Sequence, residues 1–512
     1  MRISGSIRPE KEEMPATSMP AFDRAYSGGG ERVSMATAGI DFASSYRLSI
    51  GGELVEAAES FDVYNPATGA VLAKAPAGTV DQLDTAVAAA KAAFPGWSRL
   101  SWDEREGYLT RFADALQAQS EELTTLLTLE QGKPRHSMAK GEVEAAIYWV
   151  REVAKRRLPR EIIEETEQHV VETRSTPLGV VAAITPWNFP VLLGLWKIAP
   201  CLITGNTMVM KPSPYTPLCT LRFGEIAQGI LPKGVLNIVS GGNELGQHLT
   251  AHPDIAKVSF TGSTATGKRV MESGAVNLKR VTLELGGNDP AIVLPDADYK
   301  DLIPKLFWAA FGNSGQWCIA IKRLYVHSDI HAAFVKEFVA YARDRKVGDG
   351  MDPDTDLGPI QNRMQFDKLK NLFADIAANG YAVPLGGTID ESRAGNFVPV
   401  TIVDNPPEQS RIVQEEPFGP VLPIIAYDDI EDVITRANQT PFGLAASVWG
   451  RDKAKAYEIA SRLEAGTVWV NEIHIHGIDI PFGGHKQSGL GVENGREGLS
   501  EYTNTKVVMT AR

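Results

Sequence analysis

Residues 255–287 read IAKVSFTGSTATGKRVMESGAVNLKRVTLELGG, and this stretch decides the fold. It opens with a β-branched, apolar run, passes through a glycine-rich turn into a segment with helical spacing, and ends in a second apolar run. A strand, a helix and a strand at this cadence predict two parallel strands joined by a crossover helix. Sheets of this kind bind ligands where strands end and helices begin, so a ligand site is predicted at that edge.

The same alternation extends in both directions along the chain. Short β-branched runs at 179–185, 206–213 and 234–240 alternate with helical segments, and amphipathic helical spacing fills about 81–158. A second series of strands and helices, with loops rich in proline and glycine, runs from about 290 to 485. The chain is therefore predicted to be an α/β protein with a Rossmann-like parallel sheet and a second α/β unit.

Three further segments show the alternation of strands. YRLSIGGELV at 46–55 predicts the first strand of the chain. EIIEETEQHVVETRS at 161–175 predicts an antiparallel ribbon that is polar on both faces, a form that usually needs a partner to be stable. SEYTNTKVVMT at 500–510 is predicted to pair with this ribbon. We expect the ribbon to lie at a contact between subunits.

Composition narrows the class of function. The 512 residues suffice for two or more domains, and 43% apolar and 22% charged residues are typical of a globular protein. A net charge of -12 offers no basic face for phosphates, which disfavours nucleic acid as a ligand. No apolar run approaches the roughly 20 residues that span a bilayer, so we expect a soluble protein without membrane contact.

Cysteine usage and the first residues bear on the compartment. Three cysteines without a CxxC pair indicate a reducing, cytoplasmic setting. Residues 1–40 lack the apolar region of a signal peptide and are predicted to form a disordered tail. Met35 offers a second start just before the first predicted strand, which leaves open whether residues 1–34 belong to the mature protein.

Two features indicate a nucleotide. In FTGSTATG, Gly262 and Gly267 flank a polar turn that opens a helix, where backbone N–H groups and the helix dipole attract phosphate. The spacing differs from the GxGxxG fingerprint, and glycine-rich turns of this kind are common. Lys211, which follows another strand, is either a charge partner for the nucleotide or an ordinary solvated lysine.

Three side chains are candidates for covalent catalysis. Cys318 lies in a glycine-rich polar loop, whereas Cys201 and Cys219 lie in apolar segments where cysteine packs as a small hydrophobe. Glu284 has apolar neighbours that raise a carboxyl pKa toward the range of a general base, although an edge-strand glutamate facing water is the simpler interpretation. Asn188, held between prolines, is either an oxyanion donor or a turn residue. Together with the nucleotide loop, they supply the nucleophile, the base and the oxyanion donor that covalent thiol catalysis with a dinucleotide requires.

Eight motifs resemble, in order, those of the aldehyde dehydrogenase superfamily, and the resemblance runs from about residue 47 to the end. They are ITPWNFP (184–190), MKPSPYTP (210–217), FTGSTATG (260–267), LELGGN (283–288), NSGQWC (313–318), EEPFGPV (415–421), TVWVN (467–471) and PFGGHKQSGLG (481–491). The predicted domains are a dinucleotide-binding domain (41–158 and 176–286), a catalytic domain (287–487) and a small antiparallel ribbon of oligomerisation segments (159–175 and 488–512). The resemblance implies a homodimer or homotetramer.

The resemblance also implies catalytic roles. Cys318 would attack the aldehyde carbon to form a thiohemiacetal, whose oxyanion is held by the Asn188 amide and the Cys318 backbone N–H. Glu284 would activate the water that hydrolyses the thioester. Glu493 matches a second acid that is sometimes given a role in proton relay. Because branches that transfer the acyl group to coenzyme A lack the residue that Glu284 matches, hydrolysis to a free acid is expected.

The implied cofactor is NAD, with NADP possible. Lys211 and Glu416 would hold the two riboses, Ser263 would contact the pyrophosphate, and Phe418 would pack near the nicotinamide ribose. Many relatives that prefer NAD carry a glutamate where this chain has Pro214, and its loss removes repulsion against a 2′-phosphate. The full predicted set is Trp187, Lys211, Ser213, Gly262, Ser263, Gly267, Glu416 and Phe418.

The implied substrate pocket is an aromatic, mainly apolar funnel. Because relatives that act on dicarboxylic semialdehydes tend to have arginine where this chain has Trp196, aromatic or medium-chain aldehydes are expected first and quaternary-ammonium or amino aldehydes second. Trp317 either narrows the tunnel and stacks on the substrate or is packed away from it. The predicted lining is Phe189, Trp196, Trp317, Ile319, His476 and Phe482, with His474 nearby.

Three other functions are alternatives to this interpretation. The HIH at 474–476 places two imidazoles on one face of a predicted strand but offers no third ligand, so no metal is expected. A non-catalytic binding protein with this fold need not retain Cys318, Glu284, Asn188 and Lys211 together, and an assay of thiol-dependent esterase activity would reveal it. A coenzyme A-acylating enzyme would be recognised from its products with and without coenzyme A.

Overall fold

Residues 255–287 form the predicted strand, helix and strand. The two strands pair in parallel from Lys257 opposite Arg280 to Thr261 opposite Glu284. The three elements are β10 (Ile255–Thr261), α8 (Thr264–Gly274) and β11 (Arg280–Glu284), with a 3-10 turn η2 (Ala275–Asn277) before β11. The predicted crossover unit is therefore confirmed.

The computed structural model describes residue 42 and residues 45–512. The predictions for residues 1–40 and for a start at Met35 lie outside these residues. Within them, no helix combines the length and the apolar character needed to cross a bilayer.

β10 and β11 belong to an eight-stranded sheet, the first of two large sheets. Its central strands β9, β8, β7, β10 and β11 run parallel, and antiparallel strands complete both edges. The order is β2 (Glu53–Val55), β1 (Leu48–Ile50), β9 (Leu236–Ile238), β8 (Thr207–Lys211), β7 (Val180–Ile184), β10, β11 and β21 (Gly489–Leu490). The Rossmann-like parallel sheet is confirmed.

The prediction of a single strand at 46–55 is wrong. It is a hairpin in which β1 and β2 pair antiparallel, with Ile50 opposite Glu53. Gly51 and Gly52 form the turn with φ of 62° and 82°, which only glycine adopts without strain. The alternating pattern continues across the two glycines, which is why the sequence looked like one strand.

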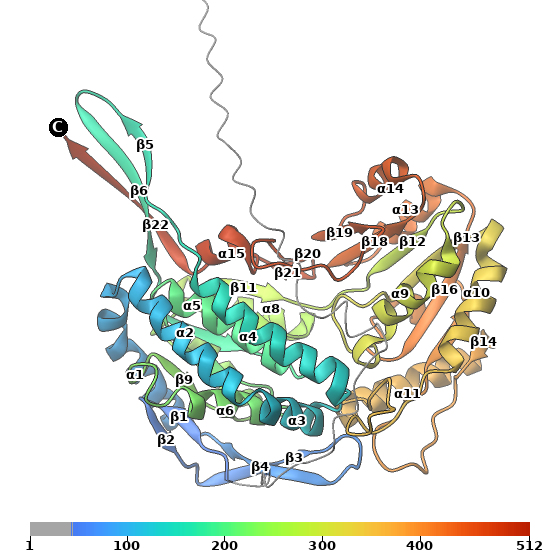
Figure 1. The fold of residues 1–512 in the computed structure, drawn as a ribbon, viewed down its shortest axis with the longest axis horizontal. Coiled ribbons are helices and arrows are strands. Elements are labelled where there is room, and N and C mark those ends of the chain that lie inside the picture. Colours follow the sequence, from blue (N-terminus) through green and yellow to red (C-terminus); the bar gives the residue numbers. More distant parts are fainter. Residues whose placement is uncertain (1–41, 43–44) are drawn as a thin grey trace, which may run out of the picture.

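Helices cover both faces of the first sheet. α2 to α6 pack against one another on one face, where Figure 1 shows α2, α3 and α4 in front, and α1, α7 and α8 pack together on the other. α1 and α2 begin with capping boxes at Thr79 and Ser101. The helices are α1 (Val80–Arg99), α2 (Trp102–Ala118), α3 (Ser120–Gln131), the π-helical turn η1 (Arg135–Ala139), α4 (Lys140–Ala154), α5 (Pro190–Ile203), α6 (Leu218–Ile226) and α7 (Asn243–Ala251).

A seven-stranded sheet forms the second α/β unit, as predicted. Its strands are parallel except for β14, and β12 places alternate residues in two apolar cores, one of them continuous with the core of the first sheet. The order is β14 (Ala382–Leu385), β15 (Thr401–Asp404), β16 (Val421–Tyr427), β13 (Arg323–His327), β12 (Pro290–Val293), β18 (Ala445–Trp449) and β19 (Thr467–Val470). Its helices are α9 (Tyr299–Phe311), η3 (Gly312–Gly315), α10 (Ser328–Arg343), α11 (Arg363–Ala378), α12 (Arg411–Gln414), α13 (Ile430–Asn438) and α14 (Lys453–Ala460).

A three-stranded antiparallel ribbon stands out from the body (Figure 1). β6 (His169–Pro177) pairs with β5 (Glu161–Glu165) on one side and with β22 (Thr503–Ala511) on the other. The predicted pairing of the tail with the ribbon is confirmed. The remaining elements are the hairpin of β3 (Glu59–Tyr64) and β4 (Val71–Ala77), the pair of β17 (Phe442–Gly443) and β20 (His485–Lys486), and α15 (Gly495–Ser500).

Candidate active site

The carboxyl edge of the first sheet carries several predicted nucleotide residues and the predicted base. Lys211 ends β8, Glu284 ends β11, and β10 leads through Gly262 into α8. Ser263 is the N-cap of α8, and its hydroxyl accepts a hydrogen bond from the Thr266 backbone N–H. Because these strands are parallel, the predicted residues meet at one edge of the sheet.

Cys318 lies just after η3, at the edge of the second unit. Its side chain is half-buried, whereas Cys201 and Cys219 are fully buried, as predicted. Asn313 and Ser314 before it adopt left-handed backbone angles, with φ of 52° and 56°. Such conformations cost energy in residues other than glycine and persist where the surroundings impose them, often at functional sites.

The environment of Cys318 keeps its thiol protonated. Burial, and to a lesser extent the carboxyl groups of Asp289 and Glu284, raise the pKa of Cys318 to about 12 against the opposing effect of Lys322. The Lys322 ammonium group donates to the Cys318 carbonyl oxygen at 2.5 Å and lies 3.4 Å from a carboxylate oxygen of Glu416. Thiol attack from this state therefore requires a nearby group that accepts the proton.

Glu284 is buried, so the interpretation as an edge glutamate facing water is wrong. Only 6% of the residue is exposed, and within the described chain neither of its carboxyl oxygens has a hydrogen-bond partner. Burial raises the pKa of Glu284 well above its usual value, Glu493 raises it further, and Lys197 opposes them. A carboxyl group without a partner beside a thiol is suited to exchanging protons with a reacting molecule.

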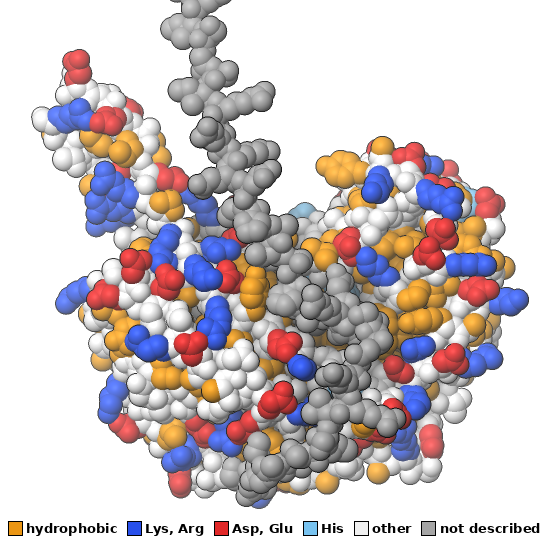
Figure 2. Space-filling model, viewed as in Figure 1, with side chains coloured by type: hydrophobic (Ala, Val, Ile, Leu, Met, Phe, Trp, Pro, Cys, Tyr) orange, Lys and Arg blue, Asp and Glu red, His pale blue; other side chains and the backbone are white. Residues whose placement is uncertain are grey.

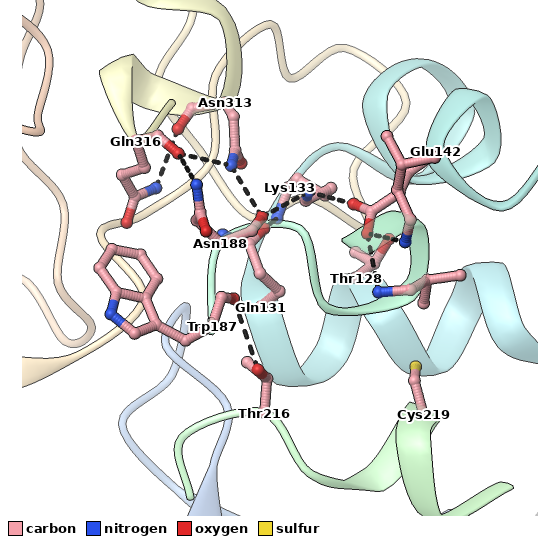
Figure 3. Close-up of polar contacts among 12 residues, drawn as sticks. Thr128, Gln131, Lys133, Glu142, Trp187, Asn188, Thr216, Cys219, Asn313 and Gln316 are labelled. Carbon is pink, nitrogen blue, oxygen red and sulfur yellow. Dashed lines mark hydrogen bonds and ion pairs between the residues drawn. The ribbon is translucent and has the colours of Figure 1, made fainter. Parts of the chain in front are cut away.

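Asn188 is also buried, which excludes an ordinary turn asparagine. Its side-chain amide donates to the Gln316 carbonyl oxygen at 3.0 Å, two residues before Cys318 (Figure 3). The amide is therefore fixed next to the loop that carries the thiol. A fixed amide N–H can stabilise an oxyanion that forms on an atom bonded to that thiol.

Glu493 forms a buried ion pair with Lys197. Their charged atoms lie 2.7 Å apart, both side chains are 2% exposed, and the Ser259 hydroxyl donates to the same carboxylate oxygen at 3.1 Å. Because Glu493 and Lys197 act in opposite directions on the pKa of Glu284, this pair belongs to the electrostatic surroundings of Glu284.

The predicted cofactor residues form a narrow cradle. A Cβ atom at Gly262 would lie 2.6 Å from the Phe260 ring, and one at Gly267 would lie 2.6 Å from Leu285. Lys211 is buried rather than solvated, and burial lowers its pKa to about 8. A buried ammonium group at the edge where α8 begins fits the polyhydroxyl and phosphate groups of a dinucleotide.

The remaining predicted cofactor residues come from the edge of the first sheet and from the second unit. Phe418 has a φ of 53°, and its ring meets Trp187 edge to face with centroids 5.4 Å apart. Glu416 accepts a hydrogen bond from the Gly287 N–H at 3.1 Å, and the Ser213 hydroxyl accepts one from the Tyr215 N–H at 3.3 Å. Glu416 and Phe418 come from the second unit, so a ligand at this edge would contact both α/β units.

The predicted pocket residues form two aromatic clusters. In the first, Trp317 packs between Phe189, at a centroid distance of 5.0 Å, and His474, at 4.1 Å. In the second, Trp196 packs edge to face against Phe482 at 6.1 Å and against His476 at 6.3 Å. Trp317 is only 8% exposed, so its ring is almost completely covered by its neighbours.

The two histidines belong to these clusters. The segment that contains them is not a strand, and His474 has a φ of 60°. Burial lowers the pKa of His474 to about 3 and that of His476 to about 4, so both imidazoles are neutral at physiological pH. His474 Nε2 lies 2.9 Å from the Ile319 carbonyl oxygen, which fixes its ring. Among the described residues, no group of three or more His, Cys, Asp or Glu side chains is placed to hold a metal ion.

Comparison with known proteins identifies the family. The model of the aldehyde dehydrogenase family matches residues 54–508. The chain belongs to the aldehyde dehydrogenase family. The activity shared by this family, oxidation of an aldehyde with a nicotinamide dinucleotide, follows from that membership.

Three aldehyde dehydrogenases illustrate the similarity. Aldehyde dehydrogenase LUC3 of a Fusarium species is 41% identical over 92% of this chain and 99% of its own. Phenylacetaldehyde dehydrogenase of Pseudomonas fluorescens is 38% identical over 91% of this chain and 96% of its own. The crystal structure of betaine aldehyde dehydrogenase of Staphylococcus aureus with NAD+ has a TM-score of 0.88 and 34% identity, and covers 91% of this chain and 94% of its own.

Sequence reasoning missed several charged and polar residues of this aldehyde dehydrogenase. Lys197 is buried in α5, and Lys322 is buried just before β13. Gln316 accepts a hydrogen bond from the Asn188 amide through its backbone carbonyl oxygen. Lys133 and Glu142 form an ion pair behind Asn188. A lysine within an apolar helix, as in GLWKIAP at 194–200, was a signal that could have identified Lys197.

Proposed function

We propose that the chain oxidises an aromatic or medium-chain hydrophobic aldehyde to the carboxylic acid, with reduction of NAD+, through a thioester on Cys318. The observation that carries this proposal is the half-buried thiol of Cys318 beside the buried carboxyl group of Glu284, which has no hydrogen-bond partner among the described residues. A nucleophile and a base close to each other are the requirements for acyl transfer to water.

The proposed reaction assigns one step to each side chain. The Cys318 thiol loses its proton to water, the thiolate forms a bond to the aldehyde carbon, and the oxyanion that results is stabilised by the Asn188 amide. Bound NAD supplies the acceptor for the hydride that is lost when this adduct becomes a thioester. Glu284 then accepts a proton from water as the water attacks the thioester carbon. The carbon–sulfur bond breaks, the acid leaves, and Cys318 is restored as a thiolate.

We propose NAD as the cofactor, held at the carboxyl edge of the first sheet. Lys211 and Glu416 would bind its ribose hydroxyls, and Ser263 at the start of α8 would contact the pyrophosphate. The NAD+ complex of the Staphylococcus aureus structure supports this assignment. NADP stays open because Pro214 offers no carboxylate to repel a 2′-phosphate.

The domain assignment and the compartment are proposals too. Residues 41–158 and 176–286 would form the dinucleotide-binding domain and residues 287–487 the catalytic domain. The first sheet and the second sheet support this division, since β11 and β12 lie on either side of its boundary. Three unpaired cysteines support a reducing, cytoplasmic setting.

The test is the formation of NADH or NADPH by the purified protein, followed at 340 nm. Benzaldehyde-type, straight-chain and trimethylammonio aldehydes are compared with each cofactor. Turnover of the aromatic or medium-chain aldehydes with NAD, and release of free acid with or without coenzyme A, would support the proposal. A product that forms only with coenzyme A would contradict hydrolysis by Glu284.

A quaternary-ammonium or amino aldehyde is the second candidate substrate. The aromatic cluster of Trp196, His476 and Phe482 is uncharged, and aromatic faces attract onium groups. The structural similarity to a betaine aldehyde dehydrogenase favours the same class. A higher kcat/KM for the trimethylammonio aldehyde than for the aromatic aldehyde would establish it as the substrate.

Trp317→Leu is predicted to change substrate preference. Removal of the aromatic wall should lower kcat/KM for benzaldehyde-type substrates by about 10-fold relative to straight-chain aldehydes of similar size. Parallel measurements of kcat/KM for both classes check this, with Tyr457→Leu, at an exposed tyrosine on α14, as the control. An equal loss for both classes would show that Trp317 does not contact the substrate.

We propose that the ribbon mediates assembly into a homodimer or homotetramer. It exposes apolar side chains between charged ones (Figure 2), and an isolated ribbon of this kind needs a partner. The exposed large apolar residues of the ribbon are Ile162, Ile163, Val507 and Met509.

A double charge substitution on β22 is predicted to dissociate this assembly. Val507→Glu/Met509→Glu places carboxylates on one face of the strand, and burying them against a second ribbon would be strongly unfavourable. Sedimentation velocity should show a dimer or tetramer for the wild type and a monomer for the variant. Lys506→Glu, on the opposite face of the same strand, should keep the assembly. A monomeric wild type would contradict the proposal.

A further inference from the structure

We propose that the buried ion pair of Lys133 and Glu142 is a positioning device for the oxyanion donor Asn188. The inference rests on the proposed function, because it assigns the Asn188 amide to the oxyanion. Lys133 lies in the turn after α3, and Glu142 lies in the first turn of α4. Neither residue belongs to the sheet edge or loop that carries the reacting groups.

The pair is completely buried. Both side chains have an exposed fraction of 0%, and the Lys133 ammonium group donates to one carboxylate oxygen of Glu142. Burial of two charges is expensive, and an apolar pair of similar volume is often at least as stable. The pair therefore needs an explanation other than stability, and its remaining contacts supply one.

Lys133 contacts the segment that contains Asn188 directly. Its ammonium group donates a second hydrogen bond, of 2.8 Å, to the backbone carbonyl oxygen of Asn188. It also lies 3.8 Å from the centroid of the Phe189 ring, a cation–π contact. One cation therefore fixes the backbone of the donor residue and the aromatic ring that follows it.

Glu142 holds the other end of the same loop. Its second carboxylate oxygen accepts hydrogen bonds from the backbone N–H groups of Val191, at 2.9 Å, and Leu192, at 3.1 Å. These groups belong to the first turn of α5, where N–H groups lack partners within the helix. The ion pair thus joins the carbonyl of Asn188 to the first turn of α5, which begins two residues later.

The loop of Cys318 holds Asn188 from the opposite side. Asn313 donates its side-chain amide to the Asn188 carbonyl oxygen at 3.1 Å, and the Gln316 carbonyl oxygen accepts from the Asn188 amide at 3.0 Å. Figure 3 shows Asn188 between these two residues and the ion pair of Lys133 and Glu142. Since an amide has two N–H hydrogens, the bond to Gln316 leaves the second for an oxyanion.

The test is a double-mutant cycle between the pair and Asn188. Lys133→Met/Glu142→Gln removes both charges together, so no unpaired charge is buried, and glutamine still accepts from the α5 N–H groups. The expected loss in kcat is about 10- to 100-fold, because small displacements of an oxyanion donor are costly. In an Asn188→Ala background, the same change should cause almost no further loss.

A matched control removes a hydrogen bond at the other end of α5. Arg105 is a buried cation that donates to the Ile203 carbonyl oxygen at 2.8 Å, at the C-terminus of α5. Arg105→Met should lower the Tm without a comparable loss in kcat. If Lys133→Met/Glu142→Gln does not fold, Lys133→Gln/Glu142→Gln replaces it, since glutamine keeps an N–H donor for Asn188, and a smaller loss that also vanishes in the Asn188→Ala background is expected.

The outcomes separate the inference from the proposed function. If the wild type is active and the fold-losses in kcat of the pair variant and of Asn188→Ala multiply in the combined variant, the pair does not act through Asn188. The inference is then overturned while the proposed function stands. A loss for Arg105→Met equal to that of the pair would overturn it as well. If the wild type oxidises no aldehyde in a Cys318-dependent manner, the proposed function fails, and the inference fails with it.

Discussion

Cys318→Ala is expected to abolish aldehyde oxidation, with kcat/KM falling on the order of 10³-fold or more. Without the sulfur atom, no covalent adduct forms, and neither Asn188 nor Glu284 has an intermediate to stabilise or hydrolyse. The measurement is NADH formation at 340 nm with the best aldehyde, together with the dissociation constant of NAD. Binding of NAD should be retained, because Cys318 lies outside the predicted cofactor cradle.

Cys201→Ala is the matched control for this substitution. Cys201 is fully buried in α5, and its burial raises the pKa of the thiol well above the usual value, so it should not react. Its removal should lower stability slightly and leave kcat unchanged. Comparable activity in wild type and Cys318→Ala would show that another group carries the reaction.

Glu284→Gln is expected to stop the reaction at the thioester. Loss of the base should slow hydrolysis by about 10²- to 10⁴-fold, while the first turnover still releases one NADH per active site. Rapid mixing should therefore show a burst at 340 nm followed by a slow steady state. Glu272→Gln, at an exposed position on α8, is the control and should show wild-type kinetics. A variant without burst and with an unchanged steady state would contradict the role of Glu284.

The same residue predicts the direction of the pH dependence. Because burial and Glu493 raise the pKa of Glu284, the carboxyl group is protonated at pH values where an exposed glutamate is charged. Only the carboxylate accepts a proton from water, so the rate of hydrolysis should increase with pH through this raised pKa. The rise should be absent from the residual hydrolysis of Glu284→Gln. Stability should change in the opposite direction. The unfolded chain releases the Glu284 proton at the usual glutamate pKa, so the free energy of unfolding should decrease as the pH rises from that value to the raised pKa of the folded state.

The sequence predicted the parts of this site that depend on local pattern. The unit at 255–287, the pairing of β22 with β6 and the distinction between Cys318 and the two buried thiols all follow from residue spacing and composition. Contacts between distant residues were beyond that reasoning. Lys197 and Glu493 are 296 positions apart, and Lys133 and Asn188 are 55 positions apart.

Burial of charged residues was the least predictable property. Lys211 and Glu284 looked like exposed residues at strand ends, because nothing adjacent in sequence covers them. Glu493, which raises the pKa of Glu284, comes from the C-terminal part of the chain, far from Glu284 in the sequence. The hairpin at 46–55 was missed for a different reason, since side-chain alternation is the same on both sides of a two-glycine turn.

The most direct measurement is the intact and peptide mass of Glu284→Gln mixed with aldehyde and NAD and then quenched in acid. We expect a mass increase equal to the acyl group of the aldehyde, located on the peptide that contains Cys318 and absent from Cys318→Ala/Glu284→Gln. An acyl group on another residue, or NADH formation without any adduct on Cys318, would contradict covalent catalysis by this thiol.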